Sequence, residues 1–225
     1  MDKIRTLVIR YENRLAQREI PLFRGAVINT MGDSADRLYH NHNGDSVVYN
    51  YPLIQYKRIG QCAAIVAVDA GVDVMGQFLS SDISRLHIGE REENFKIADV
   101  RADRCLVQIW NGDFEYHLHK WLPFNSDNYA EYKTIDCLSD KISFMEKILV
   151  GNILSFAKSL GIIFSSEISC KLLSIDRQCL YLYKGVKMMA FDITFKSNVT
   201  LPEFIGLGKG VSLGFGTVNR VKSEK

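Results

Sequence analysis

Hydrophobic positions alternate with polar ones in several short runs along the chain. Residues 3–11 alternate in this way and predict a strand. Residues 51–58 and 62–68 are two β-rich runs separated by Ile59-Gly60-Gln61, which predicts a hairpin. Further β-rich runs span residues 95–109, 114–122, 168–175, 179–195 and 217–221. Strands therefore account for most of the predicted elements.

One long segment has helical spacing instead. Apolar residues between positions 142 and 160 recur at intervals of 3, 4, 4, 3 and 4, which predicts a helix over residues 140–160. Ser139 is the expected N-cap and Gly161 the expected end. A brief helix is expected within residues 14–30 and another over 72–84, whereas residues 33–45 lack apolar periodicity and are expected to form a loop.

These elements occur in the same order twice: a strand, a helix, a hairpin, a helix or loop, and a last strand. That order is typical of the ferredoxin-like fold. We therefore predict an α+β protein of two tandem ferredoxin-like (RRM-like) domains with antiparallel sheets. The expected domains are residues 1–105 and residues 106–225.

Composition narrows the class of protein. The N-terminus lacks the apolar core of a signal peptide, and the longest aliphatic run, residues 63–68, is too short to span a membrane. A cytoplasmic protein without membrane contact is expected. The five cysteines never form a C-x-x-C pair, so neither a disulfide framework nor a structural zinc site is predicted. The formal net charge of +2 excludes a protein that binds polyanions by charge alone.

Five of the 16 glycines fall within residues 206–216, around Lys209 and Ser212. Interleaved apolar residues argue against a flexible linker, so an ordered loop with phosphate as its ligand is expected. The register excludes a P-loop, because Val211 stands where the P-loop lysine would be. The spacing G-x-G-x-G also excludes a dinucleotide-binding fingerprint.

The segment from Ile205 to Val218 resembles the C-terminal glycine-rich loop of the RAMP superfamily of CRISPR-associated proteins. The lead-in over residues 198–205 resembles that of the branch that processes precursor CRISPR RNA. The resemblance implies a tandem ferredoxin-like fold, no cofactor or metal, and CRISPR repeat RNA as the partner. Other CRISPR-associated proteins and a second copy of the chain are further candidate partners. The residues expected to hold RNA in this loop are Gly206, Gly208, Lys209, Gly210, Ser212, Gly214 and Gly216.

Histidine pairs supply the candidate catalytic groups. In an extended segment, His40 and His42 would point to the same side. Imidazoles can take and give protons near neutral pH, as cleavage by the 2′-hydroxyl of RNA requires. Processing endoribonucleases of the resembled family place a catalytic histidine here, and some carry an H-x-H pair followed by a tyrosine, which Tyr49 matches. Arg37 and Lys57 are expected to contact the RNA, in place of the lysine that many relatives use.

A second pair, His117 and His119, lies on an expected strand with Trp121 on the same face. A solvent-facing role or RNA contact is expected there, and a four-imidazole zinc site with His40 and His42 is disfavoured. The leading hypothesis is a metal-independent endoribonuclease that leaves 5′-hydroxyl and 2′,3′-cyclic phosphate ends. A non-catalytic RNA-binding RAMP subunit of an effector complex is the alternative, and a ferredoxin-like protein unrelated to RNA is the third hypothesis.

Overall fold

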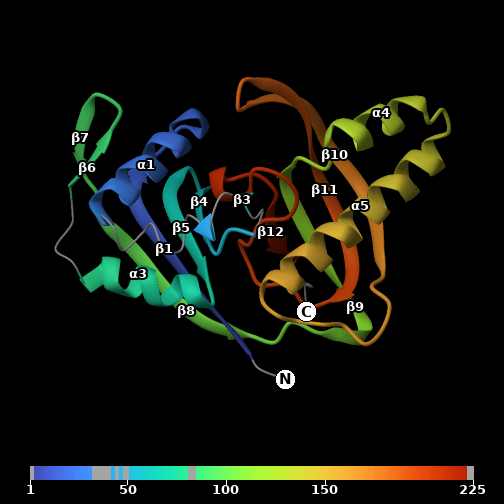
Figure 1. Ribbon diagram of the computed structural model, residues 1–225, viewed down its shortest axis with the longest axis horizontal. Coiled ribbons are helices and arrows are strands. Elements are labelled where there is room, and N and C mark those ends of the chain that lie inside the picture. The colour runs from blue at the N-terminus through green and yellow to red at the C-terminus, as the bar shows by residue number, and fades with distance from the viewer. Residues whose placement is uncertain (1–2, 32–41, 44–45, 48–50, 81–84, 222–225) are drawn as a thin grey trace. The chain divides into compact units, whose positions relative to one another are not determined.

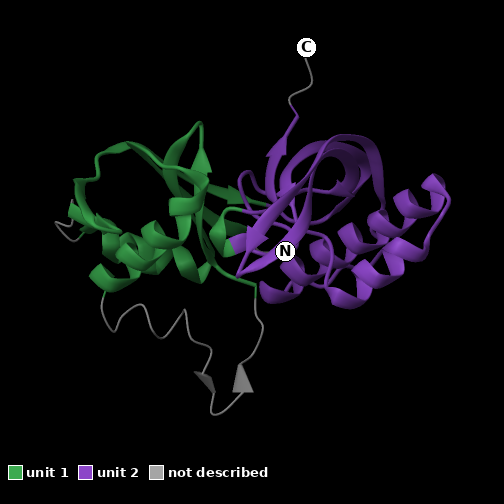
Figure 2. Cartoon of the chain, turned by 90° about the horizontal axis from the view of Figure 1, so that it is seen from above, with its two compact units in different colours: residues 1–105, 212–214 green, residues 106–211, 215–225 purple. Residues whose placement is uncertain are grey.

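The chain forms two compact units (Figure 2). Unit 1 comprises residues 1–105 and 212–214, and unit 2 comprises residues 106–211 and 215–225. The computed structural model describes residues 3–31, 42–43, 46–47, 51–80 and 85–221. No helix among these residues is long and apolar enough to cross a membrane.

Unit 1 is built on a four-stranded antiparallel sheet (Figure 1). Its strands, in sheet order, are β4 (Ile54–Ile59), β5 (Cys62–Val68), β1 (Ile4–Arg14) and β8 (Ile97–Cys105). Helix α1 (Ile20–Met31) follows β1 after the short η1 (Gln17–Glu19), and α3 (Ala70–Ser80) follows β5. Two small hairpins pair β2 (His42–Asn43) with β3 (Ser46–Val47) and β6 (Arg85–Ile88) with β7 (Arg91–Asn94). Numbered along the chain, the four sheet strands take the order 2-3-1-4, which is the ferredoxin-like arrangement.

The core of unit 1 lies between the sheet and its two helices. Phe23 of α1 stacks on Phe95 at a centroid distance of 5.3 Å and meets Tyr11 and Tyr56 edge to face at 5.8 and 5.7 Å. Such aromatic pairs contribute roughly 0.5–1.5 kcal/mol each beyond their area burial. These rings hold α1 against β1 and β4.

Unit 2 repeats the topology with a second antiparallel sheet. Its strands, in sheet order, are β10 (Cys170–Tyr183), β11 (Val186–Val199), β9 (Ile109–Trp121) and β12 (Thr217–Arg220). Helices α4 (Ser126–Thr134) and α5 (Leu138–Ser159) connect β9 to β10 (Figure 1). The connection from β11 to β12 holds the glycine-rich segment 206–216 and the short η2 (Val211–Leu213), at the position where unit 1 has α3.

One face of the unit 2 sheet packs against α5. The apolar stripe of the helix is buried, and the indole Nε1 of Trp121 donates to the side-chain oxygen of Asn152 at 2.9 Å. On β9 the buried Tyr116 and Leu118 alternate with His117, which is partly exposed. The histidine side of the sheet is therefore the face opposite to the core.

The structure confirms the predicted α+β fold of two ferredoxin-like units with antiparallel sheets. The hairpin around Gly60 is present, with Gly60 and Gln61 both at positive φ (58° and 70°), as a type I′ turn requires. The long helix also ends as predicted: Gly161 has a φ of 68° and donates its N–H to the carbonyl of Lys158.

Four details of the prediction are wrong. The N-cap of α5 is Cys137, so Ser139 lies inside the first turn. The β-rich run 179–195 is interrupted by a turn at Lys184 and Gly185, both at positive φ (49° and 81°). Helix α4 and the hairpin β6–β7 were absent from the predicted elements because their sequences have weak apolar periodicity.

Candidate nucleic-acid interface

The backbone of the glycine-rich segment 206–216 is fixed by hydrogen bonds. Within the segment, Leu207 N donates to the carbonyl of Gly216 at 2.8 Å. Two bonds join it to the end of β9: Gly216 N donates to the carbonyl of Lys120, and Lys209 N donates to that of Leu122, both at 3.1 Å. The segment is therefore an ordered loop, as the sequence predicted.

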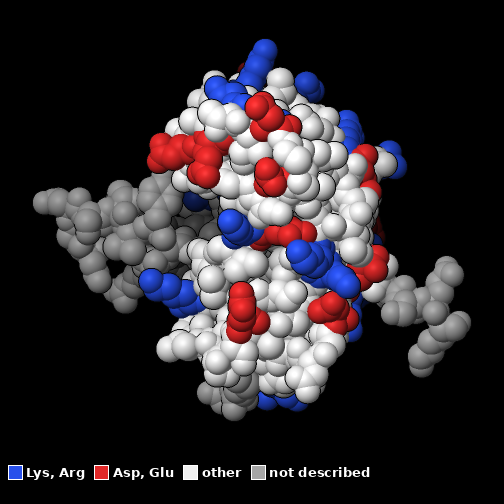
Figure 3. All heavy atoms as spheres, turned by 90° about the vertical axis from the view of Figure 1, so that its right-hand side faces the viewer, with Lys and Arg blue, Asp and Glu red and all other residues white. Residues whose placement is uncertain are grey.

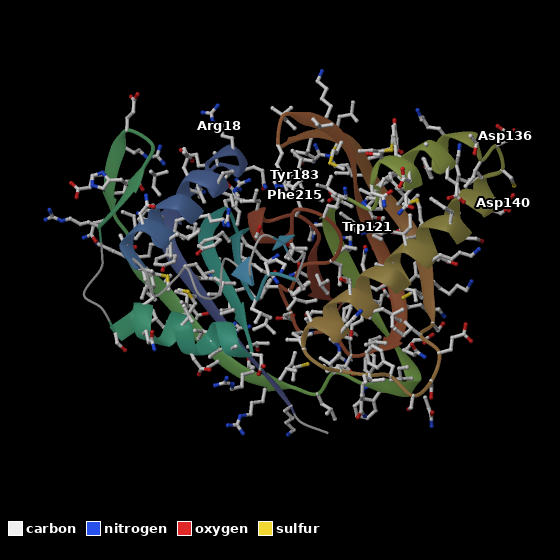
Figure 4. The ribbon with its side chains drawn as sticks, viewed as in Figure 1. Arg18, Trp121, Asp136, Asp140, Tyr183 and Phe215 are labelled. Carbon is white, nitrogen blue, oxygen red and sulfur yellow. The ribbon has the colours of Figure 1, made fainter. Side chains whose placement is uncertain are left out.

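Apolar side chains anchor the same loop. Leu207, Val211 and Phe215 are buried. The Phe215 ring lies between Tyr181 and Tyr183 of β10, with edge-to-face centroid distances of 5.8 and 5.7 Å (Figure 4). The loop is thus held at both its backbone and its side chains.

The glycines of the loop are required by the protein's own packing. A Cβ at Gly208 would lie 2.9 Å from the carbonyl oxygen of Leu122, and one at Gly210 would lie 2.8 Å from the Phe215 ring. Both glycines have positive φ, 88° and 71°. Close contacts of the same kind occur at Gly206, Gly214 and Gly216. The Cα faces of these glycines therefore point at protein atoms, and their role as RNA contacts stays a prediction.

Two polar side chains of the loop remain available to a ligand. Lys209 is exposed and Ser212 is partly exposed. An ammonium and a hydroxyl on an ordered backbone are groups that bind phosphate.

The predicted catalytic residues fall largely outside the described part of the chain. His40, Tyr49 and Arg37 lie outside the described residues. His42 lies on β2, where its backbone pairs with that of Val47. The predicted convergence of the two imidazoles therefore stays a prediction.

Lys57 is not the surface cation that the sequence suggested. It lies on β4, and its side chain is fully buried. Burial lowers the pKa of this lysine to about 7. The amine is thus easily neutralised and is withdrawn from the surface.

The second histidine pair is well defined. The rings of His117 and His119 meet at a centroid distance of 4.7 Å on the face of the sheet opposite to α5. Trp121 does not share this face, because the strand is irregular at Lys120, whose φ is 50°, and the indole turns into the core. The expectation for Trp121 is therefore wrong.

Side chains from neighbouring strands surround His117. Its Nδ1 lies 3.1 Å from Thr194 Oγ1 and 3.5 Å from Asp176 Oδ2. These groups are far apart in sequence and meet only through strand register, so the sequence alone gave no signal for them. Among the described residues, no group of three or more His, Cys, Asp or Glu side chains is placed to hold a metal ion.

The charged surface has mixed sign. On the face that carries α4 and α5, Lys and Arg side chains are interspersed with Asp and Glu (Figure 3). Such a surface does not attract a polyanion by net charge, in agreement with the total of +2. An RNA site on this face would therefore rest on specific groups.

Comparison with known proteins identifies the family. The model of the Cas6b N-terminal domain matches residues 2–105, and that of the Cas6b C-terminal domain matches residues 108–221. The uncharacterized protein MJ0978 of Methanocaldococcus jannaschii is 40% identical over 102 residues, which are 45% of this chain and 68% of that protein.

Two solved structures share the fold at 26% sequence identity, each match covering 97% of this chain and all of the other. One is described as Cas6b, with a TM-score of 0.88. The other is described as the CRISPR RNA processing endoribonuclease Cas6b, with a TM-score of 0.72. The resemblance to CRISPR-associated RAMP proteins is confirmed, and the chain belongs to the Cas6b family.

Proposed function

We propose that this chain is an endoribonuclease that cleaves CRISPR repeat RNA without a metal ion. The observation that carries the proposal is the match of both halves of the chain to the Cas6b domains, over residues 2–105 and 108–221. The shared fold with a structure described as a CRISPR RNA processing endoribonuclease supports it.

The chemistry needs few groups from the protein, because RNA carries its own nucleophile. A base removes the proton of a 2′-hydroxyl, the resulting oxygen attacks the adjacent phosphorus, and the P–O5′ bond breaks. An acid protonates the leaving 5′-oxygen, which gives a 2′,3′-cyclic phosphate and a 5′-hydroxyl. We assign His40 and His42 as base and acid, in either order, and Tyr49 to orient the reacting groups. Acid–base catalysis of this kind contributes roughly 10²–10⁴-fold.

The RNA backbone would be held by the loop 206–216. Lys209 and Ser212 supply its ligand-facing side chains, and Arg37 is assigned to a further phosphate. Because Lys57 is buried, we do not assign it to direct contact with phosphate.

The test is cleavage of a repeat transcript in the presence of EDTA. We expect defined cleavage, with products that polynucleotide kinase can label at the 5′ end without prior dephosphorylation. The double variant His40→Ala/His42→Ala should lose cleavage and keep RNA affinity. His87→Ala, which changes an exposed histidine of β6, is the matched control and should cleave normally. Cleavage that requires added Mg²⁺ would refute the metal-free mechanism. RNA binding without any cleavage would favour a non-catalytic RNA-binding subunit.

A further inference from the structure

A row of polar side chains crosses the unit 2 sheet on the face opposite to α5. The strand register pairs Ser174 of β10 with Thr194 of β11, Thr194 with His117 of β9, and His117 with Asn219 of β12. Residues paired directly across antiparallel strands share a face. The sheet therefore presents hydroxyl, imidazole and amide groups side by side, with His117 near the middle.

The hydrogen bonds around His117 fix which ring nitrogen carries a proton. Its Nδ1 lies 3.2 Å from the carbonyl oxygen of Ile193 and 3.5 Å from a carboxylate oxygen of Asp176, and both are acceptors. The third neighbour, Thr194 Oγ1, directs its own hydrogen to Asp176 at 3.2 Å. The carbonyl and the carboxylate can only accept, so they favour an N–H at Nδ1.

The carboxylate of Asp176 is itself held in place. Ser174 Oγ donates to it at 2.6 Å, and this bond is the main reason that the pKa of Asp176 lies below its usual value. With Nδ1 protonated, the Nε2 of a neutral His117 ring carries a lone pair. That Nε2 makes no hydrogen bond to any residue that the structure describes. It is a fixed acceptor in need of a donor.

His119 lies beside this acceptor. It is exposed, and its ring meets that of His117 at an interplanar angle of 64°. Partial desolvation of the ring, followed by the nearness of His117, lowers the pKa of His119. The lowered pKa favours the neutral form of this ring. Asp176 and Asp192 are both close enough to act on it electrostatically.

The carboxylates beside the two histidine rings determine which part of a nucleotide can bind on this face. The carboxylates of Asp176 and Asp192 beside these rings do not attract a phosphate. They suit the uncharged part of a nucleotide, which offers hydrogen-bond donors on its base and at its 2′-hydroxyl. Unpaired bases also stack on aromatic rings, including histidine.

We propose that this face of the unit 2 sheet binds one nucleotide of single-stranded RNA, with His117 Nε2 accepting a hydrogen bond from it and His119 stacking on its base. The proposal rests on the proposed function, because it takes RNA as the ligand. It assigns RNA contact to His117 and His119, in addition to the loop 206–216 and to His40 and His42.

The test measures affinity for repeat RNA by fluorescence anisotropy in the His40→Ala/His42→Ala background, with RNA integrity checked on a gel. The key variant is His117→Phe, which keeps an aromatic ring on this face and removes the acceptor nitrogen. We expect about tenfold weaker binding, the loss of one good hydrogen bond.

Two further variants keep the proposal testable if His117→Phe fails to fold, as judged by circular dichroism. His117→Ala and His119→Ala should each weaken binding about tenfold or more. The salt dependence of affinity should keep its slope, because no phosphate contact is lost. His87→Ala should bind normally. Affinities unchanged by all three variants would overturn the proposal.

The affinity for a DNA strand of the same sequence shows whether the 2′-hydroxyl or a base donates the hydrogen to His117 Nε2. If the 2′-hydroxyl is the donor, His117→Phe should weaken RNA binding and leave DNA binding unchanged. If a base is the donor, both should weaken equally. Either result supports the subsite. A parent protein that binds no repeat RNA at all would instead overturn the proposed function together with this subsite.

Discussion

Replacing the buried Lys57 should change the stability of the protein in a way that depends on pH. The pKa of this lysine is about 7 in the folded protein, against an ordinary value of 10.5, so the difference is about 3.5 units. Between these two values the unfolded chain binds more protons than the folded one. The contribution of Lys57 to the stability of the protein must therefore rise with pH across this window.

The size of the effect follows from about 1.36 kcal/mol for each unit of pKa difference. At pH 7 the folded lysine is half protonated, and the cost to stability is about 4 kcal/mol; at pH 10 it is about 1 kcal/mol. Lys57→Met keeps a similar volume and removes this cost. We expect the stability of the variant, relative to that of the parent, to be about 3 kcal/mol lower at pH 10 than at pH 7.

The assay is urea denaturation followed by far-UV circular dichroism at both pH values. Comparing two pH values cancels any pH-independent change in packing or in the partners of Lys57. Lys209→Met, which changes an exposed lysine, is the control and should track the parent at both values. If the stability difference between Lys57→Met and the parent is the same at pH 7 and pH 10, the lowered pKa of the buried lysine is refuted.

Three further predictions concern the loop and unit 2. Gly208→Ala should destabilise by about 2 kcal/mol or more in thermal melts, because its Cβ would meet a carbonyl at a positive φ, whereas Gly151→Ala, in an open helical position, should stabilise by about 0.5–1 kcal/mol. Equal melting shifts would contradict this. Lys209→Ala should weaken RNA binding and reduce its salt slope by about 1, measured by titration at several salt concentrations; an unchanged slope would exclude a phosphate contact. Tyr116→Phe should cost about 1–3 kcal/mol in urea denaturation, because its buried hydroxyl donates to one backbone group and accepts from another. A cost near zero would show that these bonds contribute nothing net.

Much of the fold could be predicted because periodicity and turn chemistry are local properties. The apolar stripe of α5 and the end at Gly161 follow directly from spacing and from a positive φ. The start of α5 was missed because a residue type marks a cap only weakly: the chain becomes helical at Leu138, before Ser139 is reached. The turn at Lys184 was hidden because the strands around it are long and rich in β-branched and aromatic residues.

The candidate site was less accessible to sequence reasoning. The loop 206–216 was predictable from its glycines alone. The environment of His117 was not, because Asp176 and Thr194 reach it through strand pairing across a bulged edge. The burial of Lys57 was also unpredictable, since a lysine beside Arg58 on a strand looks like surface from its sequence.

The self-packing of the loop glycines changes how their evolution should be interpreted. Selection to keep a glycine is commonly taken as a sign of ligand contact, yet here a methyl group at each loop glycine would strike the protein itself. A deep mutational scan with separate selections for cellular abundance and for RNA processing would separate the loop positions into two classes. Variants at Gly208 should lose abundance, whereas variants at Lys209 should keep abundance and lose processing. At positions such as Lys209, we expect the residue found in each relative to vary with the RNA that the relative binds.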